Sequence, residues 1–245
     1  MTASCRVVQD IPEAAIKWPS VEEIAHLSTA IENRCPSLRG SFAFMDGFHS
    51  PIAASTIQAE QNPYWSGWKH MAVCTSVIVT TTDGLIRFAA CNFPGTWHDS
   101  SIVRPLLTAI ASNPAMCPDG NSILADSAFA QRGAMAQKIL VPLTRPKYRE
   151  ASEQQRQQHK DVVSIRQGAE WAVRDVKGTY KRLRSVMPSN SAKRLQIFQL
   201  SLHLHNFRTV HLGLSQVRSV YEEHFVLQSL GYMFPYGSSV QESSS

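Results

Sequence analysis

The sequence has little cysteine and no long apolar run. Its five cysteines form no CxxC pair and show no close histidine spacing, so neither a zinc ribbon nor a disulfide framework is indicated. No apolar stretch reaches the roughly 18 residues that a membrane span needs, and the N-terminus lacks the basic start and apolar centre of a signal peptide. We therefore expect a soluble, non-secreted protein of a reducing compartment that has no membrane partner.

The common nucleotide and esterase motifs are also missing. There is no Walker A loop, no GxGxxG and no GxSxG, which leaves nucleotide hydrolysis, dinucleotide binding and serine esterase chemistry without support. His203, His205 and His211 lie in a helical pattern, where residues two apart diverge, and no carboxylate joins them at ligand spacing, so a zinc site is not supported.

Acidic residues are scarce in one part of the chain. Residues 145 to 218 hold 15 Lys or Arg against 5 Asp or Glu, a net charge of +10, whereas the remainder carries −5. Segregation of this kind favours a polyanionic partner such as a phosphate backbone. The alternative is a solvated helical surface that is simply basic.

What is present is an alternation of strand and helix patterns over 245 residues, of which 43% are apolar. Ser20 and Glu23 have the spacing of a capping box at the start of a helix. A first buried strand runs from residue 41 and ends on Asp46, and Asp83-Gly84 separates the two arms of a hairpin, 71–81 and 85–91. We expect these three strands to be antiparallel.

The second half of the chain continues with helices and two short strands. A helix follows Pro94-Gly95, and the run SILADSAF then reads as a short buried strand that ends on Asp126. KILVPL adds a last strand, and from about residue 150 the pattern is helical. The order predicts a layered α/β fold with one sheet and flanking helices.

Two aspartates therefore end strands, and if those strands are neighbours their carboxylates meet. Glu170 lies on the flank of the apolar stripe of its helix, beside Arg166 and Arg174, and can point at the same sheet edge. Three convergent carboxylates repel one another unless cations lie between them, and oxygen ligands suit Mg²⁺ or Mn²⁺. Two such ions support phosphodiester cleavage. Alternatively, Asp46 and Asp126 cap turns and Glu170 only pairs with its neighbouring arginines.

Four segments carry a family resemblance: FMDGFHSPI, PGTWHDSSI, LADSAF and RQGAEWAVRDVKGTYKRL. Their order and spacing resemble the DDE endonuclease domain of PIF/Harbinger-type transposases and their domesticated relatives. The resemblance spans roughly residues 18 to 224 and implies an RNase H-like mixed sheet flanked by helices. We expect an irregular segment over residues 1–17 and a tail with a disordered end over residues 225–245.

The resemblance also implies roles for individual residues. Asp46, Asp126 and Glu170 would be the catalytic residues and the ligands of two Mg²⁺ or Mn²⁺ ions. Asp99 of the Gly-x-x-His-Asp motif matches a further recurrent position, as a metal ligand or, slightly favoured, as a helix N-cap. Basic residues of the helical region would hold the DNA backbone: Arg166, Arg174, Lys177, Lys181 and Arg182.

The family further implies a nuclear location and a separate Myb-like DNA-binding partner, for which the sequence itself offers only the basic cluster at 181–184. Two features depart from the family. Phe48 stands where a threonine usually follows the first Asp-Gly, and we expect the chain to lack the N-terminal helix-turn-helix region of a full transposase. A relic that kept the fold and basic surface but lost catalysis, acting as a binding module, is the alternative function. The oligomeric state is left open.

Overall fold

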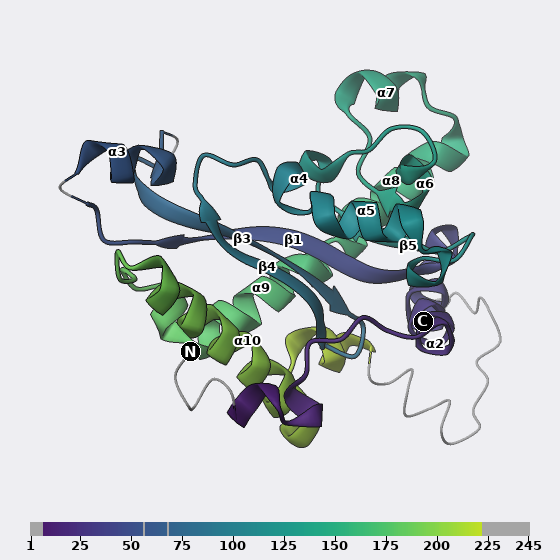
Figure 1. Ribbon diagram of the computed structural model, residues 1–245. Coiled ribbons are helices and arrows are strands. Elements are labelled where there is room, and N and C mark those ends of the chain that lie inside the picture. Colours follow the sequence, from purple (N-terminus) through teal and green to yellow (C-terminus); the bar gives the residue numbers. More distant parts are fainter. Residues whose placement is uncertain (1–6, 56, 68, 222–245) are drawn as a thin grey trace, which may run out of the picture.

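A mixed sheet of six strands forms the centre of the protein, with helices on both faces (Figure 1). The computed structural model describes residues 7–55, 57–67 and 69–221. The predicted α/β class with a mixed sheet flanked by helices is confirmed, whereas the predicted tail, residues 225–245, lies outside the described residues. No helix in the described part of the chain has the length and apolar character needed to cross a membrane.

The sheet combines an antiparallel and a parallel half. Its order is β2-β3-β1-β5-β6, with β4 also paired to β3. β1 pairs antiparallel with β3, and β3 pairs antiparallel with β2 and β4. β1, β5 and β6 are parallel. The strands are β1 (Ser41–Pro51), β2 (Trp65–Ser66), β3 (Met71–Thr81), β4 (Ile86–Pro94), β5 (Ser122–Ala125) and β6 (Ile139–Leu140).

The helices begin largely where the sequence predicts. Ser20 and Glu23 form the predicted capping box of the first long helix. The helices are α2 (Val21–Arg34), α3 (Gln58–Gln61), α4 (Asp99–Ile102), α5 (Arg104–Ser112), α6 (Met135–Lys138), α7 (Arg145–Glu150), α8 (Glu153–Ile165), α9 (Gln167–Thr179) and α10 (Ser191–Leu212). The single helix expected over residues 164–183 is instead divided at Arg166, where α8 gives way to α9, and ends in a 3-10 turn, Lys181–Leu183.

The alternation of side chains along β1 divides the interior into two cores. Phe44 and Phe48 belong to the core that α9 and α10 cover, while Ala43 and Met45 belong to the core beneath α4 and α5. In Figure 1, α9 and α10 lie on one side of the sheet and α4 and α5 on the other. Each residue of β1 is therefore committed to one face.

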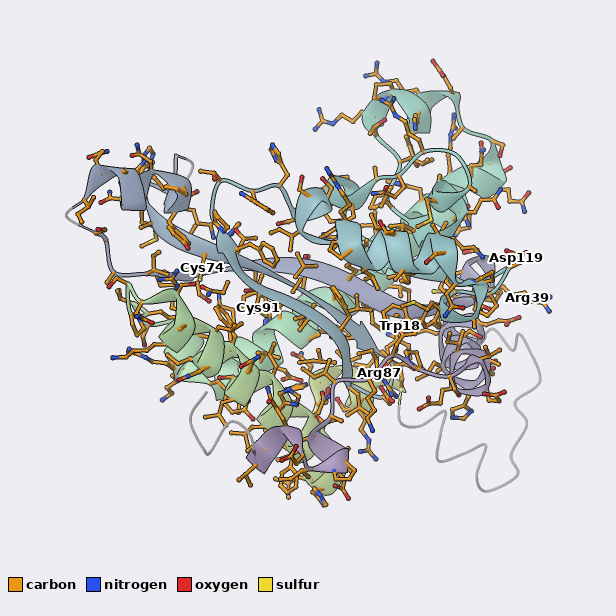
Figure 2. The ribbon with its side chains drawn as sticks, in the orientation of Figure 1. Trp18, Arg39, Cys74, Arg87, Cys91 and Asp119 are labelled. Atoms are coloured by element: carbon orange, nitrogen blue, oxygen red, sulfur yellow. The ribbon has the colours of Figure 1, made fainter. Side chains whose placement is uncertain are left out.

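The cysteines of the described residues are free thiols, in agreement with the expected absence of a disulfide framework. Cys74 and Cys91 lie on β3 and β4 (Figure 2). Burial raises the pKa of the Cys74 thiol to about 11 and that of Cys91 to about 12. Neither is a reactive thiolate near neutral pH, because the thiolate is the nucleophilic form.

The first strand does not end at Asp46, which corrects the prediction. β1 continues to Pro51 because its antiparallel partner β3 is equally long, and their pairing runs from Ala43–Thr81 to Pro51–Val73. The apolar pattern indicated an end because burial on one side of the strand decreases there: β5 stops at Ala125 while β1 goes on.

Candidate catalytic site

The register between β1 and β5 brings two aspartates together. Met45 and Ala125 are the last residues paired across this parallel ladder, and the next residue in each strand is an aspartate, Asp46 and Asp126. Parallel strands advance in step, so the two carboxylates lie at the same level. The prediction that these two strands are neighbours is confirmed.

Glu170 reaches the same place from α9. Gly168 allows this helix to come close to β1, since a Cβ there would lie 3.2 Å from the ring of Phe44. The guanidinium of Arg166 lies between two carboxylates, with its Nη2 3.0 Å from Glu170 Oε1 and its Nη1 3.5 Å from Asp126 Oδ2. The sequence offered the Arg166–Glu170 pair as the alternative to metal binding, and it gave no sign that the same arginine also reaches Asp126.

Asp46 is the most perturbed member of this group. Burial raises the pKa of its carboxyl to about 6. The neighbouring charges of Asp126 and Glu170 also raise this pKa, whereas the Gly47 N–H and the Arg166 guanidinium lower it. Both neighbouring carboxylates therefore act on Asp46, whose charged form is disfavoured chiefly by burial.

The capping alternative holds for Asp126 alone, because Asp46 lies inside β1 and caps no turn. Asp126 Oδ1 accepts hydrogen bonds from the N–H and hydroxyl of Ser127 at the start of a 3-10 turn. Asp46 Oδ1 accepts from the Gly47 N–H at 2.9 Å. In Asp126 the other oxygen, Oδ2, faces Arg166. A structural role and a place in the site are therefore compatible.

Asp99 does not cap its helix, contrary to the favoured prediction. It is the first residue of α4, and His98 occupies the N-cap position without a side-chain cap bond. Its carboxylate packs on Gly47, where a Cβ would lie 2.6 Å from Oδ2. Burial, followed by the charge of Asp126, raises the pKa of Asp99. Since Asp46 and Gly47 point to opposite faces of β1, Asp99 approaches Asp126 from the face opposite Asp46.

Gly47 is the site residue that sequence reasoning missed. The sequence feature that could have revealed it is the glycine, because a glycine inside a strand marks a bulge or the close approach of another group. Here it is the approach of Asp99 that requires the missing side chain.

The donor set fits a hard divalent cation in its chemistry. The carboxylates of Asp46, Asp126, Glu170 and Asp99 supply oxygen alone, which Mg²⁺ and Mn²⁺ prefer. The raised pKa of Asp46 belongs to a carboxylate whose charged form is disfavoured by burial, and a bound cation would favour that form. Within the described residues, however, no three acidic, histidine or cysteine groups are close enough to hold an ion, and the cation between Asp126 and Glu170 is Arg166.

The five basic residues predicted to contact DNA differ in their surroundings. Arg166 pairs with Asp126 and Glu170. Arg174, Lys181 and Arg182 are exposed. Lys177 is turned inward: its Nζ donates to the His49 carbonyl at 2.8 Å and lies 5.7 Å from the centre of the Phe48 ring. Burial and then the charges of Lys69 and Arg184 lower the pKa of Lys177.

Phe48, the departure from the family pattern, is a core residue. Its side chain is buried, and its ring centroid lies 6.2 Å from that of Phe198 on α10. The residue therefore contributes packing on the α10 face rather than a hydroxyl beside Asp46.

Comparison with known proteins gives one match. Residues 45–206, about two thirds of the chain, match the family model described as DDE superfamily endonuclease. Searches of curated proteins and of solved structures gave no match. The matched range begins next to Asp46 and includes Asp126 and Glu170, and on this evidence the chain belongs to the family of DDE superfamily endonucleases.

Proposed function

We propose that this chain is the catalytic domain of a divalent-metal-dependent DNA endonuclease of the PIF/Harbinger transposase type. One observation carries the proposal. Acidic residues from three separate parts of the chain gather here: Arg166 pairs with Asp126 and Glu170, and the charges of these two carboxylates raise the pKa of Asp46. Clusters of this kind are concentrated at functional sites.

In this proposal Asp46, Asp126 and Glu170 hold two Mg²⁺ or Mn²⁺ ions, with Asp99 as a further ligand candidate. When bound, the ions supply Lewis-acid activation of a water and stabilisation of the leaving oxygen. Arg166 offsets the repulsion among the carboxylates before a metal enters. Asp46 must be deprotonated to act as a ligand, so its pKa of about 6 in the metal-free protein predicts that metal binding weakens as the pH falls below that value.

The substrate class follows from charge. Arg174 is exposed on α9, the helix of Glu170, and Lys181 and Arg182 are exposed in the 3-10 turn that follows it. These three residues provide phosphate contacts in this proposal. Lys177 contributes less than these residues, since its ammonium group already donates to the backbone of β1. The nuclear location and the Myb-like partner stay predictions that rest on resemblance.

A plasmid-nicking assay with Mg²⁺ or Mn²⁺ tests the proposal. Wild type should nick, Asp126→Asn should lose the activity, and Asp119→Asn should keep it. The control makes the same chemical change at a fully exposed residue of the loop that precedes β5. Equal nicking by wild type and Asp126→Asn would assign the cleavage to a contaminant and reject the proposed site.

A binding module without catalysis is the second candidate, and Arg166 favours it specifically. Its two ion pairs already place a cation where the proposal needs a metal. Absence of nicking in either metal, together with DNA binding that weakens with salt, would establish this alternative.

A further inference from the structure

A buried arginine without an acidic partner lies far from the carboxylates. Arg194, in the first turn of α10, is 1% exposed and is the largest fully buried side chain of the described residues. Its Nε donates to Asn92 Oδ1 at 2.7 Å, and its Nη1 donates to the carbonyls of Pro188 and Ser189. In the described part of the chain no carboxylate pairs with it, and its Nη2 has no hydrogen-bond acceptor.

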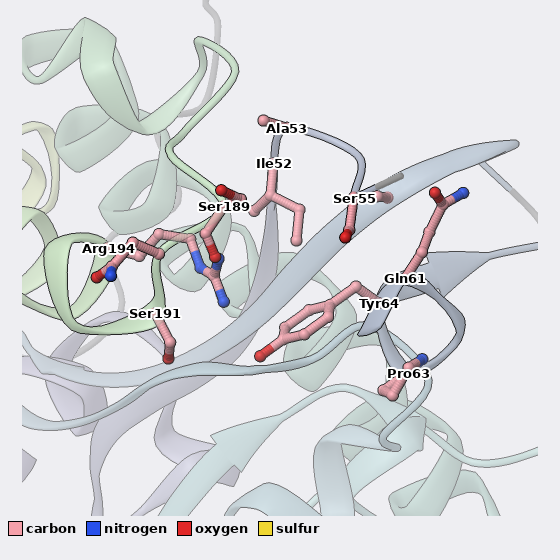
Figure 3. Close-up of a pocket in the computed structure, with 11 residues that line it drawn as sticks. Ile52, Ala53, Ser55, Gln61, Pro63, Tyr64, Ser189, Ser191 and Arg194 are labelled. Carbon is pink, nitrogen blue, oxygen red and sulfur yellow. The ribbon is translucent and has the colours of Figure 1, made fainter. Parts of the chain in front are cut away.

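This uncompensated charge borders a cavity of about 540 Å³. Figure 3 shows the Arg194 guanidinium and the Tyr64 ring facing the same space, with Ser189 and Ser191 on one side and Gln61 on the other. The Arg194 Cζ lies 4.9 Å from the centre of the Tyr64 ring, which fixes the guanidinium plane at the wall of the cavity. The cavity is therefore lined by donors rather than by acids.

The N-terminus of α10 points into the same cavity. Ser189, Asn190 and Ser191 line it, and the 22-residue helix starts at Ser191. The Asn190 side chain already caps the Lys193 N–H, while the positive end of the helix dipole still favours an anion there. Asn92 holds this end in place, since its Nδ2 donates to the Ser191 carbonyl and hydroxyl at 2.9 and 2.8 Å. It does so with a left-handed φ of 69°.

We propose that this cavity binds a phosphate group, held by Arg194 and the N-terminus of α10. The chemistry of the two donors agrees, because a guanidinium fork and helix N–H groups both match a tetrahedral oxyanion. The site is separate from the carboxylates: Ile52 borders it and Asp46 precedes Ile52 by six residues along the extended β1 chain, about 20 Å. The inference stands without the proposed cleavage chemistry.

A charge placed at the mouth of the cavity tests the site without removing the buried arginine. Ser191→Asp puts a carboxylate where the anion would lie and preserves an acceptor for Asn92. Ala192→Asp is the matched control, because it adds the same charge one residue further along the same helix turn without lining the cavity. Both acids suit the start of a helix, so both variants should fold.

The measurement is the thermal unfolding of the full chain in EDTA with inorganic phosphate against chloride at equal ionic strength. We expect phosphate to raise the unfolding temperature of wild type, since a ligand that binds only the folded state stabilises it. Ser191→Asp should bind phosphate at least roughly tenfold more weakly, and Ala192→Asp should keep most of the shift. EDTA removes any metal-dependent cleavage, so failure here is distinct from failure of the nuclease proposal.

Two results would overturn the proposal: no phosphate-specific shift in wild type, or equal losses in the two variants. The source of the phosphate is resolved by repeating the experiment with a nucleoside monophosphate and with a dinucleotide that has only an internal phosphodiester. A shift with the dinucleotide assigns the site to a DNA backbone, and a shift with the monophosphate alone assigns it to a terminal or free phosphate.

Discussion

The carboxylate of Asp99 occupies the space that a side chain at position 47 would fill. A Cβ on Gly47 would lie 2.6 Å from Asp99 Oδ2, so the close contact between β1 and α4 depends on the absence of that one atom. Gly47 adopts no left-handed conformation, and its requirement is purely steric.

Gly47→Ala should therefore destabilise the protein by about 1–3 kcal/mol, the usual cost of forcing extra volume into a packed site. Urea unfolding measures the effect. Gly67→Ala is the control, since a Cβ there meets no atom within 4 Å, and it should stay within about 0.5 kcal/mol of wild type. Adding Asp99→Ala to Gly47→Ala should restore stability, and a failure to do so would place the strain elsewhere.

The raised pKa of Asp46 predicts a pH-dependent change in stability. The folded protein holds this proton more tightly than the unfolded chain, with pKa values of about 6 and 3.8. The stabilising contribution of the protonated carboxyl is complete below pH 3.8 and is lost as the pH rises through about 6.

Asp46→Asn stays neutral at every pH. Its free energy of unfolding should therefore exceed that of wild type by roughly 2–3 kcal/mol at pH 7.5 in EDTA and equal it near pH 4. Denaturant unfolding at several pH values gives the difference. A gap between the two proteins that does not vary with pH would contradict the assignment of this titration to Asp46.

Arg166 and a divalent cation compete for the same carboxylates. Arg166→Met removes a unit charge 3.0 Å from Glu170 and 3.5 Å from Asp126, and should raise the affinity for Mn²⁺ by about tenfold. Calorimetric titration with Mn²⁺ measures it. Arg174→Met, an equal loss of charge at an exposed position of α9, should change the affinity far less; similar increases in both would point to a general electrostatic effect.

Asn206 of α10 completes the backbone bonding of β4. Its Oδ1 accepts from the Ile86 N–H at 2.8 Å, and its Nδ2 donates to the Ile86 carbonyl at 2.9 Å and to the Ala15 carbonyl at 3.1 Å. Asn206→Ala should cost about 2–4 kcal/mol, because it leaves buried backbone groups unpaired.

Thr209 on the same helix provides the contrast. Its hydroxyl is buried without a hydrogen-bond partner in the described structure. Thr209→Val should therefore be neutral or slightly stabilising, since no hydrogen bond is lost. Thermal unfolding of the two variants side by side checks both; comparable destabilisation would mean that volume rather than hydrogen bonding decides at these positions.

Local patterns predicted most of the longer elements but not all of their ends, since β1 runs past Asp46 and the helix expected over residues 164–183 is divided at Arg166. Asp83-Gly84 marked the hairpin, and the apolar runs before Asp46 and Asp126 marked two strands, but that these strands are neighbours comes from the structure. The bridging by Arg166, the inward turn of Lys177 and the donor-lined cavity at the start of α10 did not emerge. Each depends on contacts between segments distant in sequence, which periodicity does not encode.

Beyond Met45, β1 loses its second strand neighbour, and several groups on that open side find other partners. The Gly47 N–H bonds to the Asp46 side chain, the His49 carbonyl accepts from Lys177, and Pro51, which has no N–H, gives its carbonyl to the Met187 N–H. A bare strand margin would invite pairing with another chain and so promote aggregation. These contacts therefore make the open edge of β1, beside the acidic cluster, a poorer partner for a strand of another molecule. Lys177 protects this edge against aggregation in addition to supplying a positive charge.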